Sequence, residues 1–116
     1  MRVLLVEDEP AVRDAVERAL RGAGHKADLA REGPAGLELA MTNPYDAVVL
    51  DLGLPGLDGV EVCRRLDHKS TRVLMLTALG DVTTEVASLE AGARGYLTKP
   101  FSSMELLDRV EELLRQ

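Results

Sequence analysis

Ala47-Val48-Val49-Leu50-Asp51 is the stretch that decides the fold, because four consecutive apolar residues run directly into an acid. Side chains alternate between the two faces of a strand, so an uninterrupted apolar run predicts a strand that is buried on both faces. Residues 3–6 and 73–76 show the same pattern. Three such strands are typical of a parallel sheet with helices packed on both of its sides.

Two weaker strand candidates accompany this set. Residues 26–30 and 95–98 are shorter or partly alternate in polarity, as expected of strands nearer the edges of a sheet. Apolar residues at helical spacing lie between the strand candidates and predict helices. The stripes consist of Val12, Ala15, Val16, Ala19 and Leu20; of Val82, Val86, Leu89 and Ala93; and of Leu106, Leu107, Val110, Leu113 and Leu114. The stripe that begins at Val82 is the narrowest, so we expect that helix to be the least stable.

Local signals indicate where further helices begin. Pro34 follows Gly33 and opens a short helix. We expect the inner face of this helix to hold Leu37, Ala40 and Met41. Two residue pairs have the spacing of capping boxes, Asp58 with Glu61 and Ser102 with Glu105. Strand and helix thus alternate five times, which predicts a doubly wound α/β fold with a parallel sheet and right-handed crossovers.

Length and composition narrow the class of protein. The 116 residues suit one domain, 1–116, and the formal net charge of -6 disfavours direct nucleic-acid binding, which depends mainly on Lys and Arg. Cys63 is the only cysteine, and the apolar runs are far shorter than the roughly 20 residues that span a membrane. We therefore expect a cytoplasmic protein without membrane contact. We also expect Cys63 to be buried and His25 and His68 to be exposed.

Polar residues directly follow four of the predicted strands. They are Glu7 and Asp8 after residues 3–6, Asp51 after residues 47–50, Thr77 after residues 73–76 and Lys99 after residues 95–98. Ligands bind beyond the carboxyl ends of the strands in open parallel sheets. We therefore expect these five side chains to converge at one edge of the sheet.

The chemistry of this predicted cluster points to a cation and to phosphoryl transfer. Three carboxylates in proximity would repel by about 1 to 4 kcal/mol per close pair. Lys99 supplies one positive charge, and an oxygen-rich group with room for water is the environment that Mg²⁺ prefers. An aspartate carboxylate can attack phosphorus when the charge on the phosphoryl oxygens is stabilised. These residue types indicate a divalent ion and an aspartate that can accept a phosphoryl group.

Four segments also match a known family in order and spacing. They are Val6-Glu7-Asp8-Glu9, Val49-Leu50-Asp51-Leu52 running into Leu54-Pro55-Gly56-Leu57-Asp58-Gly59, Leu76-Thr77-Ala78, and Tyr96-Leu97-Thr98-Lys99-Pro100-Phe101. Together they resemble the receiver domains of two-component response regulators, which form a CheY-like superfamily, and in motif style the OmpR/PhoB-type subfamily of winged-helix transcription factors. The resemblance covers essentially the whole chain. It implies a flavodoxin-like fold with five strands in the order 2-1-3-4-5, five helices on two faces, and no output domain in this chain.

The resemblance implies a role for each residue of a magnesium site. Asp51 matches the phosphorylated aspartate, which also contacts the metal. Asp8 matches the direct Mg²⁺ ligand, and Glu7 matches the acid that acts through a metal-bound water. The backbone carbonyl of Gly53 matches the remaining protein ligand, and Mn²⁺ is expected to substitute for Mg²⁺.

Further residues match the parts that stabilise and sense the phosphoryl group. Lys99 matches the lysine that pairs with the phosphoryl group, and Thr77 matches the hydroxyl that bonds to it after transfer. Tyr96 matches the aromatic switch residue. The Lys99–Pro100 peptide bond is expected to be cis by the same resemblance.

These roles imply a signalling switch rather than a conventional enzyme. A sensor histidine kinase would donate its phosphoryl group to Asp51, and the domain would catalyse only its own phosphorylation and dephosphorylation. The surface made by the fourth helix, the fifth strand and the fifth helix would then change shape to control an output domain or a partner. Partners implied in this way are the kinase and a phosphorylation-dependent homodimer formed through that surface.

The chain departs from the subfamily pattern at two positions. Arg94 and Gly95 replace two acids that join salt bridges across the dimer surface in the OmpR/PhoB-type subfamily. We therefore expect a monomer or a weak dimer before phosphorylation. Gly53 and Leu79 match positions that flank the path of the attacking water in the family, so we expect them to tune the lifetime of the phosphoaspartate.

Three alternatives come from other classes of protein. A pseudo-receiver would act by binding alone, without phosphorylation, although all five site residues are present. A haloacid-dehalogenase-like phosphohydrolase also forms an aspartyl phosphate, but it needs a second acid at the position of Gly53. A flavodoxin-like cofactor binder needs a phosphate-cradling loop after the first strand, where this chain has the acidic segment Glu7-Asp8-Glu9.

Overall fold

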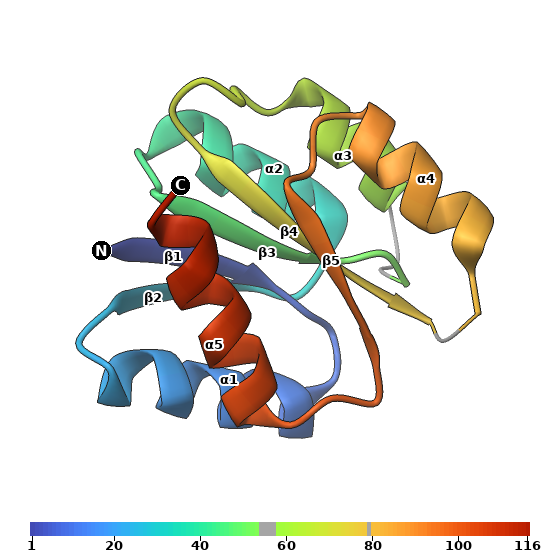
Figure 1. The fold of residues 1–116 in the computed structure, drawn as a ribbon. Coiled ribbons are helices and arrows are strands. Elements are labelled where there is room, and N and C mark those ends of the chain that lie inside the picture. The colour runs from blue at the N-terminus through green and yellow to red at the C-terminus, as the bar shows by residue number, and fades with distance from the viewer. Residues whose placement is uncertain (54–57, 79) are drawn as a thin grey trace.

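The computed structural model describes residues 1–53, 58–78 and 80–116, in which five strands and five helices alternate (Figure 1). The strands are β1 (Arg2–Val6), β2 (Lys26–Ala30), β3 (Ala47–Asp51), β4 (Arg72–Ala78) and β5 (Gly95–Lys99). The helices are α1 (Pro10–Gly22), α2 (Gly33–Thr42), α3 (Gly59–Arg65), α4 (Val82–Glu90) and α5 (Ser103–Leu114). All five predicted strands are confirmed, with ends within two residues of those expected from the apolar runs.

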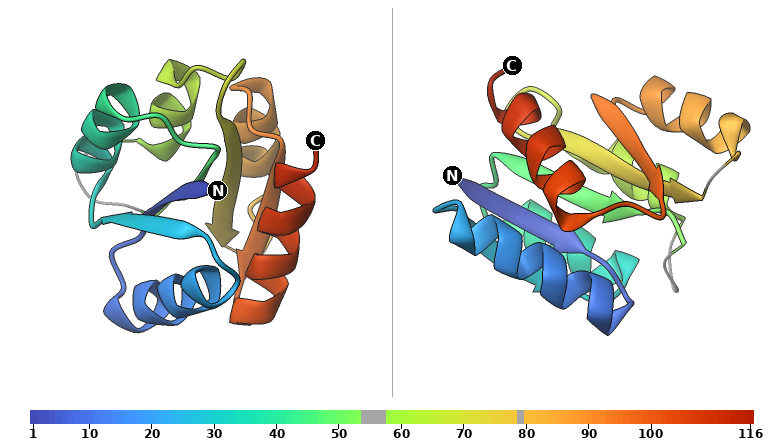
Figure 2. Two further views of the ribbon diagram at one scale, coloured as in Figure 1. Left: turned by 90° about the vertical axis from the view of Figure 1, so that its left-hand side faces the viewer. Right: turned by 60° about the horizontal axis from the view of Figure 1, so that its bottom comes forward.

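The strands form one parallel sheet in the order β2-β1-β3-β4-β5, which confirms the expected doubly wound α/β fold. The two weaker strand candidates, β2 and β5, are the two edge strands of this sheet, as their mixed polarity predicts. Helices α1 and α5 cover one face, and α2, α3 and α4 cover the other (Figures 1 and 2). Because all strands are parallel, their carboxyl ends meet at one edge of the sheet.

The hydrophobic core consists of two clusters, one on each face of the sheet. Alternate strand residues such as Val3 and Leu5 pack with α1 and α5, whereas Leu4 and Val6 belong to the cluster beneath α2, α3 and α4. This alternation lets the face of each residue be assigned from its parity within a strand. The same alternation decides on which face of the sheet each functional side chain at a strand end lies.

Helix α4 packs through a different side from the one its apolar stripe suggests. Val82, Val86 and Leu89 are 62%, 48% and 45% exposed. The buried side carries small residues, with Ser88 fully buried and its hydroxyl bonded to the Thr84 carbonyl at 2.7 Å. The spacing therefore predicted the helix correctly but not its packed face.

Helix α2 corrects a second expectation. Leu37 and Ala40 pack partly against the core as predicted, but Met41 is 70% exposed, so its assignment to the inner face was wrong. The helix instead buries Gly33 and Gly36. A Cβ built on Gly36 would lie 2.7 Å from Cγ2 and 2.9 Å from Cγ1 of Val6 in β1, so the helix approaches the sheet most closely there. This close approach sets the rotation of the helix and leaves Met41 outside.

The capping predictions hold in one case and partly in the other. Ser102 and Glu105 form the reciprocal capping box expected at the start of α5. Asp58 caps α3 by accepting from the Val60 amide, whereas Glu61 pairs with arginines of its own helix. Both helices therefore begin where the sequence predicts.

Cys63 is fully buried as expected, and burial raises the pKa of its thiol to about 11. The two histidines are less exposed than the sequence suggested. The His25 side chain is 9% exposed and lies 2.9 Å from Glu111, and His68 is half-buried against the Cys63 carbonyl. Their expected exposure was wrong, because loop histidines here fill gaps beside helices α5 and α3. None of the helices in the described part of the chain has the length and apolar character needed to cross a membrane.

The contact at Gly36 gives a stability prediction. Alanine normally stabilises a helix relative to glycine, by up to about 1 kcal/mol. At Gly36 the added methyl would meet the stiff, buried Val6, so we expect Gly36→Ala to destabilise the fold by about 1 to 3 kcal/mol in chemical denaturation. Gly22→Ala is the matched control, because a Cβ added there would have no atom within 4 Å, and it should leave stability unchanged or higher. Equal effects of the two substitutions would contradict this packing argument.

Candidate functional site

The strand ends bring four of the predicted residues together. Glu7 and Asp8 follow β1, Asp51 is the last residue of β3, and Lys99 is the last residue of β5. Asp51 and Lys99 share the parity of Val49 and Leu97, so both side chains lie on the face of the sheet covered by α1 and α5. The parallel sheet therefore brings Lys99 next to Asp51, 48 residues before it in the chain, and next to Glu7, 92 residues before it.

Lys99 bridges the two buried carboxylates. Its Nζ lies 2.9 Å from Asp51 Oδ2 and 3.0 Å from Glu7 Oε1, and 3.9 Å from Glu9 Oε1. Lys99 reaches these groups from the edge strand across β4, where its paired residue is Ala78. The small Ala78 side chain, which lies on the same face, leaves the route of the lysine open.

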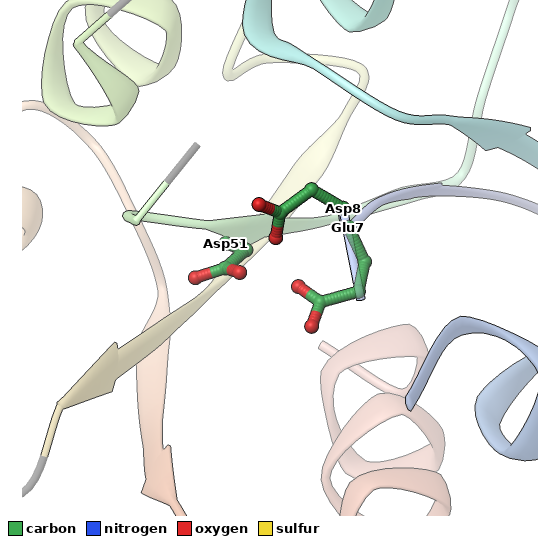
Figure 3. A group of neighbouring side chains, drawn as sticks. All are labelled: Glu7, Asp8 and Asp51. Atoms are coloured by element: carbon green, nitrogen blue, oxygen red, sulfur yellow. The ribbon is translucent and has the colours of Figure 1, made fainter. Parts of the chain in front are cut away.

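Three carboxylates form a group that fits a divalent cation. One oxygen from each of Glu7, Asp8 and Asp51 can be chosen so that all lie within 4.8 Å of one another. Figure 3 shows the three carboxyl groups approaching a shared region from the ends of β1 and β3. Glu7 and Asp51 are buried, whereas Asp8 is exposed and opens the group to water. Hard oxygen donors with access for water are what Mg²⁺ requires, so these residues fit such an ion.

The charges of the buried groups are strongly perturbed. Burial, and then the hydrogen bond with Asp51, raises the pKa of Glu7 to about 8. Burial acts to raise the pKa of Asp51 too, but hydrogen bonds with Glu7, the Gly53 amide and Lys99 outweigh it and hold that pKa below its usual range. Burial likewise opposes the charge of Lys99, and the two carboxylates outweigh it and raise the lysine pKa. These shifts favour an ionised Asp51, a charged Lys99 and a protonated Glu7 near neutral pH when no metal is bound.

A cleft of about 720 Å³ opens onto this group. Asp8, Asp51 and Lys99 line one end of it, and residues of α1 together with Pro100 and Phe101 line an apolar extension. The Lys99–Pro100 peptide bond is cis. A substrate could therefore approach Asp51 from solvent between α1 and the segment that follows β5.

Thr77 and Tyr96 make their side-chain contacts on the face of the sheet covered by α2, α3 and α4. Thr77 is buried, and its hydroxyl is 3.5 Å from Glu85 Oε1 on α4. Tyr96 packs against the core cluster beneath α2, α3 and α4. The two predicted switch residues are thus on the face opposite Asp51 and Lys99, next to α4.

Other contacts refine what the sequence indicated. The Gly53 amide donates to Asp51 Oδ1 at 3.0 Å and holds that carboxylate in place. Glu85 next to Thr77 and a buried Arg13 beneath the turn after β1 were not predicted, since no motif or spacing marks them. The expectation for Leu79, and the motif segment 54–57, lie outside the described residues.

Comparison with known proteins agrees with this geometry. The sequence model of one family, described as the response regulator receiver domain, matches residues 3–111. The chain is 48% identical to the transcriptional regulatory protein TcrA of Mycobacterium tuberculosis over 100% of this chain and 47% of TcrA. It is 49% identical to the transcriptional regulatory protein CutR of Streptomyces coelicolor over 100% of this chain and 54% of CutR. The chain thus spans about half the length of these curated relatives.

The fold itself has similar solved structures. The receiver domain of the Francisella response regulator 1452 superposes with a TM-score of 0.88 at 33% identity, covering 98% of this chain and 96% of that one. Sequence, fold and the acids at the strand ends point to one family. The chain belongs to the receiver domain family of two-component response regulators.

Proposed function

We propose that the domain accepts a phosphoryl group from a sensor histidine kinase on the carboxylate of Asp51. The observation that carries this proposal is the Lys99 ammonium held 2.9 Å from a buried, ionised Asp51 at the end of an open cleft. A buried carboxylate with a depressed pKa is a competent nucleophile only if the charge that forms around it is stabilised. Lys99 stabilises that charge directly, and the neighbouring acids would do so through a bound divalent ion.

Glu7, Asp8, Asp51 and the Gly53 carbonyl would hold Mg²⁺, or Mn²⁺ in its place. Asp8 is the exposed member and the one we assign as a direct ligand, with Glu7 acting through a bound water. The ion, when bound, supplies positive charge opposite the phosphoryl oxygens.

The residues of the chain then carry the transfer. An Asp51 carboxylate oxygen attacks phosphorus in line, the new P–O bond forms, and the P–N bond of the phosphohistidine breaks with its electron pair going to the imidazole nitrogen. Lys99 remains beside Asp51 and pairs with the phosphoryl oxygens. The apolar end of the cleft, formed by residues of α1 with Pro100 and Phe101, adjoins the site of transfer.

Thr77 and Tyr96 would pass the change to the surface. Thr77 turns its hydroxyl from Glu85 toward the phosphoryl oxygens, and Tyr96 moves into the space that is vacated. The change alters the surface of α4, β5 and α5, which controls an output domain or partner, and phosphorylation acts by shifting a two-state population. Gly53 and Leu79 would tune the lifetime of the phosphoaspartate.

The proposal also covers the compartment, the phosphodonor and the oligomeric state of the domain. The domain acts in the cytoplasm with a sensor kinase as donor, and it forms at most a weak dimer through α4, β5 and α5 until it is phosphorylated. Exposed Arg94 at the start of that surface supports the weak dimer, since the subfamily acid is missing there. The net charge of -6 supports an output that does not rely on nucleic-acid contacts by this domain.

Phosphorylation of Asp51 is directly measurable. Incubation with Mg²⁺ and acetyl phosphate or phosphoramidate should add one phosphoryl group in intact mass spectrometry, because the nucleophile is Asp51. Asp51→Asn should abolish the addition, and Asp108→Asn, at an exposed position of α5, should leave it unchanged. An unmodified parent protein would favour the pseudo-receiver, and sustained turnover of an external phosphomonoester would favour a phosphohydrolase.

The raised pKa of Glu7 predicts how metal binding depends on pH. The pKa of the Glu7 carboxyl is about 8. Below that pH the metal-free carboxyl holds a proton, which the ion must displace, and above it the carboxylate is already charged. Mg²⁺ affinity should therefore rise with pH, by up to roughly tenfold per unit below about pH 8, and then level off. Calorimetric titration between about pH 6 and pH 9 checks this. Glu7→Gln should bind more weakly and with a flatter pH profile, and a flat profile in the parent would contradict the assignment.

A further inference from the structure

Arg13 is a buried arginine that the proposed chemistry does not use. It lies in the first turn of α1 and is only 8% exposed, although arginine normally keeps its charged end in water. The guanidinium is permanently charged, so its burial needs compensation. In the described part of the chain the side chain makes one hydrogen bond, from Nη1 to the backbone carbonyl of Glu7 at 3.3 Å.

This hydrogen bond closes a short clamp around the turn that carries the acids. The Glu7 amide donates to the Ala30 carbonyl at 3.0 Å, so Arg13 and β2 hold the two sides of one residue. The Arg13 amide in turn donates to the Glu9 carbonyl at 2.9 Å. The segment from Glu7 to Arg13 is thus fastened at both ends, and Glu7, Asp8 and Glu9 all lie within it.

The acidic charge of the turn explains why a positively charged donor, the Arg13 guanidinium, lies behind it. Once Glu7 has lost its proton, Glu7 and Asp8 both repel Asp51, and nothing on the turn itself is cationic. A guanidinium behind the turn binds the Glu7 carbonyl as a charge-assisted donor and offsets part of the negative potential. Arg13 does not line the cleft, and its permanently cationic guanidinium is not a ligand for a metal ion.

We infer that Arg13 is a positioning residue for the metal-binding acids: its hydrogen bond to the Glu7 carbonyl fixes the turn in which Glu7 and Asp8 point at Asp51. The inference rests on the proposed function and deepens it. The competing account is that only the aliphatic part of the side chain matters, as packing beneath α1.

Three variants separate these accounts. Arg13→Met keeps the apolar stem and removes donor and charge, Arg13→Lys keeps a charged donor, and Arg18→Met is a control at an exposed position of the same helix. Mg²⁺ affinity is measured by calorimetry, and amide hydrogen exchange of Asp8 and Glu9 is measured in the metal-free protein.

We expect Arg13→Met to lower Mg²⁺ affinity by roughly 10- to 100-fold, as for other residues that orient ligands from behind, and to speed exchange of the two amides. Arg13→Lys should recover part of both, and Arg18→Met should behave as the parent. The kinetics with acetyl phosphate should show a higher magnesium requirement for Arg13→Met with a near-parental rate at saturating Mg²⁺.

The opposite results would overturn the inference. If folded Arg13→Met binds Mg²⁺ like the parent and its turn exchanges no faster, the side chain acts by packing alone. If Arg13→Met does not fold, Arg13→Gln decides: its side chain is two atoms shorter than that of arginine and carries no charge, so parental Mg²⁺ affinity in this variant rejects the role. If the parent itself neither binds Mg²⁺ nor becomes phosphorylated, the proposed function fails. Unchanged amide exchange of Asp8 and Glu9 in Arg13→Met would separately reject the positioning role of Arg13.

Discussion

The bridge that the Lys99 ammonium makes between Asp51 and Glu7 is the interaction on which the site depends. Without the lysine, Asp51 would lose a hydrogen bond and a positive charge that keep it ionised beside a second buried carboxyl group. The bridge requires an edge strand to deliver a long side chain across its neighbour, and this is possible because β4 presents Ala78 at that point. The order of the strands, the small residue and the long lysine are thus parts of one arrangement.

The fold was largely predictable because buried parallel strands have a simple signature. Unbroken apolar runs identified β1, β3 and β4, and their weaker counterparts at β2 and β5 proved to be the edges. The packed sides of the helices were harder to predict. Periodicity gives the phase of an apolar stripe, but Gly36 and Ser88 occupy buried faces for reasons of close approach that a count of apolar residues does not register.

The site was predictable where topology alone decides proximity. Residues that directly follow parallel strands must meet, so the sequence alone was enough to group the acids at the ends of β1 and β3 with Lys99. Strand parity divides the two faces as well, and it separates Thr77 and Tyr96 from the lysine, which proximity in the strand order does not reveal. Arg13 and Glu85 could not be predicted in this way, because their contacts depend on how α1 and α4 are rotated against the sheet.

Helix α4 rests on the sheet through small groups, with Ser88 and the C-cap residue Ala91 buried and the larger Val82, Val86 and Leu89 exposed. Helices α1 and α5, by contrast, commit Leu20, Leu106 and Leu113 to the interior. Short side chains interdigitate little with the residues beneath them. A lateral shift of the helix would therefore create little cavity volume and lose few van der Waals contacts. Because α4 exposes its large apolar residues and buries small ones, displacing it from the sheet costs less free energy than displacing α1 or α5.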